Sequence, residues 1–268
     1  TTAATTAAAA VTAAAATAAA PRDHHIGLIV PSSNLTMETE LPRMLAAREQ
    51  LLPDDRFVFH SARARMQHVT PDQLRAMNAQ ADRAAAELAD ARPDVVATAC
   101  LVAIMAQGPG YHCTAEQSIT TALRANGAHA PVISSAGALL AGITALGATR
   151  VAIITPYLKP LTQAVADYLE HTGIEVVDAL SLEVPDNLTV AHLDPTDLHQ
   201  HWRTLDLSRA DALVLSACVQ MPSLPAIQTI ENDAGLPVLT AATATTYRIL
   251  QELGLPPIVP NAGKLLAG

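Results

Sequence analysis

Short apolar runs alternate with longer amphipathic segments along almost the whole chain. The apolar runs are expected to form buried strands, at residues 26–30, 57–62, 94–99, 131–133, 151–154, 174–179, 212–216 and 237–239. The segments between them carry apolar residues at helical spacing and are expected to form helices, at residues 36–48, 71–90, 114–126, 136–147, 158–171, 195–205, 222–234 and 241–253. Such alternation is typical of parallel sheets with helices on both faces, so the pattern predicts an α/β fold.

The same series of motifs occurs twice in this chain. The strings HIGLIVPSSN (25–34), RPDVVATAC (92–100) and PVISSAGALLAGITALG (131–147) return in the same order as RVAIITPYLK (150–159), RADALVLSAC (209–218) and PVLTAATATTYRILQELG (237–254). The repeat predicts two lobes related by a pseudo-twofold axis, each a parallel sheet flanked by helices. We expect one lobe to comprise residues 25–136 plus 240–268 and the other residues 137–239, with the active site in the cleft between them.

Residues 1–24 are expected to be a low-complexity, disordered tail outside the fold. The first 20 residues contain only Ala, Thr and one Val, and they lack the charged and strongly apolar regions of a secretory signal. The helix predicted at 71–90 is expected to begin with Thr70 as its N-cap and Pro71 at its first position.

Composition narrows the classes of partner and the location. Apolar residues make up 50% of the chain and aromatic residues only 3%, so the core must be built mainly from Ala, Val, Leu and Ile. A net charge of −9 without a block of Lys or Arg argues against nucleic acid as a partner. No window is apolar enough for a membrane helix, so no membrane association is expected. Three cysteines, an odd number, predict reduced thiols and a cytoplasmic location.

Two cysteines occupy matching positions in the repeat. Cys100 and Cys218 each follow a predicted strand, and ligands of parallel α/β sheets bind beyond the carboxyl ends of the strands. A single cysteine at such a place is usually a small buried hydrophobe, but two at equivalent positions favour a functional pair facing one cleft. Cys113 has no counterpart in the repeat and is expected to lie in a loop without a role.

Polar residues at other strand ends are candidate substrate ligands. Ser32, Ser33 and Asn34 follow the first strand, and their hydroxyl and amide groups suit a carboxylate, although plain helix capping explains most such clusters. Tyr157 follows the fifth strand and Asn187 lies in a later loop, and each is also of a type that stabilises loops. These residues are therefore candidates only in combination with the cysteine pair.

Several cofactor and hydrolase motifs are missing from the sequence. The GPGY string at 108–111 lacks the spacing of a dinucleotide-binding loop, and no phosphate-binding lysine motif is present. The ten histidines form no convincing metal-ligand set, and His199 and His201, two apart on a predicted helix, are read as solvated. The G-x-S-x-G motif of α/β-hydrolases is also missing. We therefore expect neither cofactor nor metal.

With these motifs assembled, the chain resembles the maleate cis–trans isomerases of the Asp/Glu racemase superfamily over roughly residues 25–265. The resemblance rests on IVPSSN with METE, ACLVAIM running to GPGYH, TPYLKPLT, PDNLTV and SACVQMPSLPAIQ. It implies Cys100 as nucleophile and Cys218 as partner thiol, with Asn34, Tyr157 and Asn187 holding the substrate carboxylates. The apolar neighbours expected to keep the site dry are Leu101, Val102 and Val219. One departure is Thr98, where the resemblance leads us to expect Tyr.

The resemblance implies cofactor-independent isomerisation of a small dicarboxylate, maleate to fumarate, in a homodimeric enzyme. A thiolate can add to the double bond, allow rotation about the new single bond and leave again, which divides one prohibitive step into accessible ones. The alternatives are an amino-acid or hydantoin racemase, an arylmalonate-type decarboxylase, and a two-lobed binding protein without chemistry. The racemases usually place Asn-Thr after the cysteine, whereas Leu-Val and Val-Gln follow it here.

Overall fold

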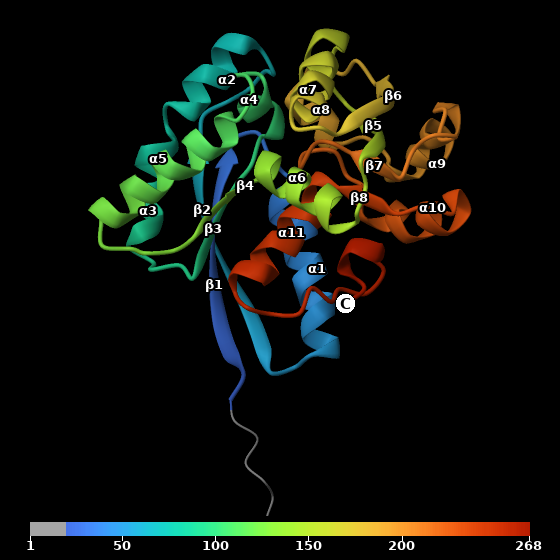
Figure 1. Ribbon diagram of the computed structural model, residues 1–268. Coiled ribbons are helices and arrows are strands. Elements are labelled where there is room, and N and C mark those ends of the chain that lie inside the picture. Colours follow the sequence, from blue (N-terminus) through green and yellow to red (C-terminus); the bar gives the residue numbers. More distant parts are fainter. Residues whose placement is uncertain (1–19) are drawn as a thin grey trace, which may run out of the picture.

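The computed structural model describes residues 20–268, and its core is a pair of four-stranded parallel sheets. The first sheet has the order β2-β1-β3-β4, with β1 at Arg22–Pro31, β2 at Asp55–Ala64, β3 at Val95–Thr98 and β4 at Val132–Ser134. The second has the order β6-β5-β7-β8, with β5 at Arg150–Thr155, β6 at Glu175–Ser181, β7 at Ala212–Ser216 and β8 at Val238–Thr240. The identical order confirms the predicted α/β fold and the predicted repeat (Figure 1).

The helices of the first half are α1 (Met37–Leu51), α2 (Pro71–Asn78), α3 (Ala81–Ala89), α4 (Leu101–Met105), α5 (Tyr111–Ala125) and α6 (Ser135–Ala145). Thr70 caps α2 as predicted, since its hydroxyl accepts a hydrogen bond from the Gln73 amide. The single helix predicted at 71–90 is wrong in one respect: it is interrupted before Ala81. The Gln80 side chain accepts a hydrogen bond from the Arg65 amide across this interruption, which fixes the turn to the end of β2.

Cys113 lies in the first turn of α5, so the loop predicted there is wrong. The helix begins three residues earlier than expected, after Gly110, which adopts a φ of 74°. Glycine takes this left-handed conformation without steric cost, so the chain can turn sharply into the helix. The short helix α4 was missed because five residues are too few to show helical periodicity.

The helices of the second half are α7 (Lys159–His171), α8 (Asn187–Ala191), α9 (Leu198–His201), α10 (Ile227–Ala234) and α11 (Ala241–Glu252). The helix predicted at 195–205 is instead three short turns, η1 (Pro195–Asp197), α9 and η2 (Trp202–Thr204). The helix predicted at 222–234 begins as the 3-10 turn η3 (Leu224–Ala226) and continues as α10, and a last turn, η4 (Lys264–Leu266), follows α11.

Strand β1 begins earlier than predicted, so the boundary of the N-terminal tail at residue 24 is wrong. Residues 22–24 pair with Asp55, Arg56 and Phe57 of β2. His24 is buried, and its Nε2 lies 2.9 Å from a carboxylate oxygen of Asp55. Residues 1–19 of the predicted tail lie outside the described residues.

Helices α6 and α11 lie between the two sheets and pack against each other (Figure 1). Their close approach depends on Gly142 of α6, where an added Cβ would come within 3.1 Å of Leu265 and 3.2 Å of Ala244. Strands β3 and β7 are buried along their whole length, as expected for parallel strands covered on both faces. None of the helices between residues 20 and 268 is long and apolar enough to cross a membrane.

Candidate active site

A small cavity lies beyond the carboxyl ends of β1, β3, β5 and β7. It offers only about 10 Å³ of space to the centre of a water molecule, which is about the minimum for a single water. None of its lining residues carries a charged side chain, and they come from both halves of the repeat: Pro31, Asn34, Met66, Val69, Cys100, Val102, Tyr157, Asn187, Cys218, Val219 and Gln220. The predicted convergence of both cysteines on one site is therefore present in the structure.

Cys100 is held in a strained conformation at the start of α4. Its φ of 74° and ψ of 68° lie in the left-handed region, which costs a residue other than glycine on the order of 1–3 kcal/mol. The thiol is buried, and this burial raises the pKa of Cys100 to about 12, against the opposing effect of the Ala103 amide. Cys100 therefore rests as a neutral thiol, in a conformation that its sequence neighbours did not reveal.

Cys218 lies close to Cys100 and has more hydrogen-bond donors around it. Burial raises the pKa of the Cys218 thiol, while the Tyr157 hydroxyl and the amides of Gln220 and Met221 act in the opposite direction. The Gln220 amide lies 3.4 Å from the Cys218 sulfur. Negative charge on Cys218 further raises the pKa of Cys100, and both thiols are free. Of the two sulfurs, Cys218 has the surroundings that better stabilise a thiolate.

Tyr157 is a buried phenol at the end of β5. Burial raises its pKa, and the neighbouring charges of Cys218 and Cys100 raise it further, so the hydroxyl stays protonated and can donate. The hydroxyl also lies 3.2 Å from the Ala217 carbonyl oxygen, which is a weak, long contact for this pair of groups. A ligand in the cavity can therefore compete for its proton.

Asn34 and Asn187 enter the cavity from different halves of the repeat. The Asn34 side-chain oxygen accepts a hydrogen bond of 2.9 Å from the Met37 amide and so caps the beginning of α1. Within residues 20–268 its Nδ2 makes no hydrogen bond, which leaves this donor available to a ligand. The Nδ2 of Asn187 donates to the Ser33 hydroxyl at 2.8 Å, so only its second hydrogen is available.

Three of the predicted site residues, and Thr98, lie away from the cavity. Ser32 and Ser33 do not line the cavity, because their hydroxyls donate to the Met66 carbonyl at 3.3 and 2.6 Å and brace the segment that follows β2. Leu101, the first residue of α4, packs into the core and also does not line the cavity. Thr98 lines a separate cavity with Asn78 and Tyr111, so it does not shape the space around the cysteines.

The segment after β2 covers the cavity and is joined to α8. Met66 and Val69 contribute to the lining, and between them His68 forms an isolated antiparallel bridge with Asp186. The His68 Nδ1 lies 3.9 Å from the Asp186 carboxylate. In this arrangement the cavity has no room for a dicarboxylate.

Gln220, Met66 and Val69 were not among the residues predicted from the sequence. Gln220 lay inside the quoted string SACVQMPSLPAIQ, but its type alone did not distinguish it from a surface residue. Among residues 20–268, no group of three or more His, Cys, Asp or Glu side chains is placed to hold a metal ion. The site therefore combines two thiols with neutral hydrogen-bond donors.

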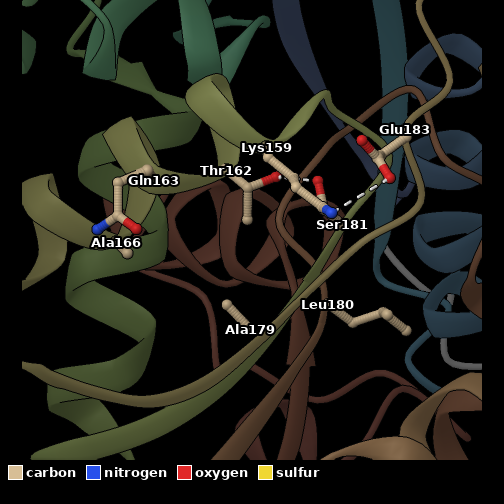
Figure 2. A pocket seen from close by; sticks show the side chains of 8 residues that line it. All are labelled: Lys159, Thr162, Gln163, Ala166, Ala179, Leu180, Ser181 and Glu183. Atoms are coloured by element: carbon tan, nitrogen blue, oxygen red, sulfur yellow. Dashed lines mark hydrogen bonds and ion pairs between the residues drawn. The ribbon is translucent and has the colours of Figure 1, made fainter.

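A larger hollow lies on the outer side of the second sheet, between α7 and β6 (Figure 2). It has about 490 Å³ of space, but its polar groups are largely paired with one another. Lys159 lies 3.8 Å from Glu183, and the hydroxyls of Thr162 and Ser181 are 2.7 Å apart. Neither Cys100 nor Cys218 lines it, so its size does not make it the active site.

The comparisons with known proteins agree with this geometry. Residues 26–266 match the family model described as arylmalonate decarboxylase. The maleate isomerase of Geobacillus stearothermophilus is 58% identical over 243 residues, covering 91% of this chain and 97% of that protein. The solved maleate isomerase of Pseudomonas putida S16, a cysteine-to-alanine variant with maleate, superimposes with a TM-score of 0.91 at 51% identity, covering 92% of this chain and 98% of that one.

A second solved structure records a covalent state. It is a cysteine-to-serine mutant of the Nocardia farcinica maleate cis–trans isomerase with a covalently bound succinylcysteine intermediate. It superimposes on this chain with a TM-score of 0.88 at 49% identity, and the match covers 91% of this chain and 98% of that one.

Proposed function

Because the chain belongs to the maleate isomerase family, within the wider family described as arylmalonate decarboxylase, we propose that it converts maleate to fumarate without a cofactor. The observation that carries the proposal is the pair of buried thiols, Cys100 and Cys218, which meet in one cavity among neutral donors. The succinylcysteine seen in the Nocardia farcinica relative is the intermediate expected of such a thiol.

The reaction starts from the form of the pair in which Cys218 is ionised. Burial raises the pKa of Cys218, and the Tyr157 hydroxyl and the amides of Gln220 and Met221 oppose that shift. As the Cys100 sulfur adds to one alkene carbon, its proton passes to Cys218, and the π electrons move toward the other carbon and its carboxylate. Cys218 then returns the proton to that carbon, which gives a succinyl thioether on Cys100. After rotation about the central C–C bond, Cys218 removes a proton from the adduct and the C–S bond breaks, which releases fumarate and leaves its electron pair on the Cys100 sulfur. The proton then passes from Cys218 to Cys100, which restores the starting state.

Neutral donors stabilise the charge that develops on the substrate. The free Nδ2 of Asn34 and the Tyr157 hydroxyl are fixed before the substrate arrives, one by its capping bond to α1 and the other by burial. Preorganised donors of this kind in a dry site contribute more than they would in water. Asn187 supplies a further hydrogen, and Val102 and Val219 exclude water.

Proton exchange at a single carbon, as in a racemase, and a binding role without chemistry have less support. A racemase would use the same two thiols, but the relatives at 55–58% identity are maleate isomerases. A binding protein has no need of a strained, buried cysteine such as Cys100.

The test is incubation of the purified protein with maleate and no added cofactor, followed by proton NMR for fumarate. Cys100→Ser is expected to abolish turnover. Cys218→Ser is expected to accumulate protein heavier by one maleic acid, with the added mass on Cys100 in peptide mapping. Cys113→Ser is the matched control, because this exposed thiol lies outside the cavity, and its activity is expected to equal the wild type. Absence of fumarate from the wild type would overturn the proposal.

We further propose a cytoplasmic homodimer with the two lobes divided at residues 25–136 plus 240–268 and 137–239. Reduced cysteines support the location, and the family resemblance supports the dimer. The lobe division is supported by the contacts of α11, which reaches back to α1, β3 and β4 of the first half. Light scattering coupled to size-exclusion chromatography tests the dimer, and limited proteolysis between the lobes tests the division.

A further inference from the structure

Gln220 is a buried side chain whose amide joins three separate segments around the cavity. Its Oε1 accepts a hydrogen bond of 2.9 Å from the Leu35 amide. Its Nε2 donates to the carbonyl oxygens of Ser33 at 2.8 Å and Asn187 at 2.9 Å. The loop after β7, the turn after β1 and the first residue of α8 are thus tied to one side chain.

The backbone of the same residue adds two further contacts. Its amide donates to the Cys218 sulfur at 3.4 Å, and its carbonyl oxygen accepts from the Thr36 hydroxyl at 2.6 Å. The side chain holds the peptide groups on both sides of Asn34, while the amide touches the thiol. Gln220 therefore links the Cys218 sulfur to both asparagines that line the cavity.

The hydrogen-bond pattern requires a glutamine. Two donors must meet the Ser33 and Asn187 carbonyls and one acceptor must meet the Leu35 amide, which is the inventory of a primary amide. Glutamate would place a carboxylate oxygen against two carbonyl oxygens, and methionine would leave three buried backbone groups without this partner. Buried groups left unsatisfied are costly, so neither change is neutral.

We propose that Gln220 is a positioning residue that sets the Cys218 thiol against the substrate donors Asn34 and Asn187. The inference rests on the proposed function, since it concerns the same reaction. It predicts that loss of the amide misplaces these groups relative to one another while both thiols remain present. Misplacement of about 1 Å typically costs on the order of 100-fold in rate.

The kinetic test uses Gln220→Met and Gln220→Glu, with Gln228→Met as the matched control. Gln228 lies on α10, where its side-chain amide donates hydrogen bonds to Glu231 and Asn232 of the same helix. Per folded protein, Gln220→Met is expected to lose about 100-fold in kcat/KM with most of the loss in kcat, and Gln228→Met is expected to match the wild type. Circular dichroism gives the folded fraction used to normalise each rate.

The pH profile separates positioning from stability. A protonated glutamate regains one donor, so Gln220→Glu is expected to recover part of its activity, relative to the wild type at the same pH, as the pH falls, whereas Gln220→Met is not. Should Gln220→Met fail to fold, Gln220→Glu alone carries this test. Normal kcat per folded protein, or a pH profile for Gln220→Glu parallel to the wild type, would overturn the inference.

A second measurement needs no turnover and so distinguishes this inference from the proposed function. Iodoacetamide labelling, followed by peptide mass spectrometry, reports the access of Cys218 and Cys100. Loss of the Gln220 contacts is expected to speed labelling of Cys218 at least tenfold, with Gln228→Met unchanged. If the wild type makes no fumarate but the labelling changes as expected, the function fails and the positioning role stands. Unchanged labelling contradicts the positioning role.

Discussion

The protonation state of Cys100 yields the sharpest prediction. Burial raises its pKa from an ordinary value of 9.0 to about 12, a shift that corresponds to about 4 kcal/mol of disfavoured ionisation. At pH 8 an ordinary thiol of pKa 9.0 is about one-tenth ionised, whereas one of pKa 12 is ionised to about one part in 10⁴. The free enzyme is therefore expected to alkylate at Cys100 about 1000-fold more slowly than an unburied thiol.

The assay is iodoacetamide alkylation of the Cys113→Ser variant, in which the exposed thiol is absent. The rate of labelling is measured by peptide mass spectrometry at pH values from 6 to 10, with glutathione as the reference thiol. Labelling of Cys100 is expected to rise without a plateau over this range. The fold favours the protonated Cys100 thiol. The contribution of this thiol to the free energy of unfolding is therefore fully present below pH 9.0 and is lost as the pH rises toward 12. A plateau below pH 8, or labelling as fast as glutathione, would refute the reasoning.

Three further changes test the surroundings of the thiols. Glu40 is buried and accepts hydrogen bonds from the Ser223 and Leu224 amides. Glu40→Gln keeps an acceptor and is expected to fold normally. Glu40→Ala is expected to lose about 2 kcal/mol of unfolding free energy in urea titrations. Asn34→Asp keeps the cap of α1 but places a negative charge beside an anionic substrate, so the melting temperature is expected to hold while KM rises at least about tenfold. Tyr157→Phe removes one donor and is expected to lower kcat by about 100-fold with little change in stability. Equal stability of the two Glu40 variants, an unchanged KM for Asn34→Asp, or normal kcat for Tyr157→Phe would each contradict the assigned contact.

A large part of the fold could be predicted from local patterns. Apolar runs of strand length located the eight strands that the structure describes, and the repeated motifs predicted two related lobes, which the structure shows as two sheets with the same strand order. Both predictions succeed because a parallel strand buried on both faces must be apolar along its length, a property visible in a short window of sequence. The same reasoning missed α4 and α8, since five residues show no periodicity, and it merged α2 with α3.

The candidate site could be predicted in part. The repeat predicted that Cys100 and Cys218 lie near each other, because equivalent strand ends of two related sheets face the same region. Ser33 illustrates the limit: its hydroxyl type suits a carboxylate, but in the fold it is already bonded to Asn187, 154 residues away in the sequence. Which polar groups remain free for a ligand depends on which are used by distant partners.

The sequence by itself determined the α/β class, the duplication and the matching positions of Cys100 and Cys218, because these follow from residue type and local spacing. Only the tertiary structure decided the left-handed conformation of Cys100, the small cavity at the two thiols and the hydrogen bonds of Gln220. The bond between Gln220 and Leu35 joins residues 185 positions apart, and no local window contains both. The protonation of Cys100 is likewise set by burial, which arises only when two lobes and their connecting loops exclude water together.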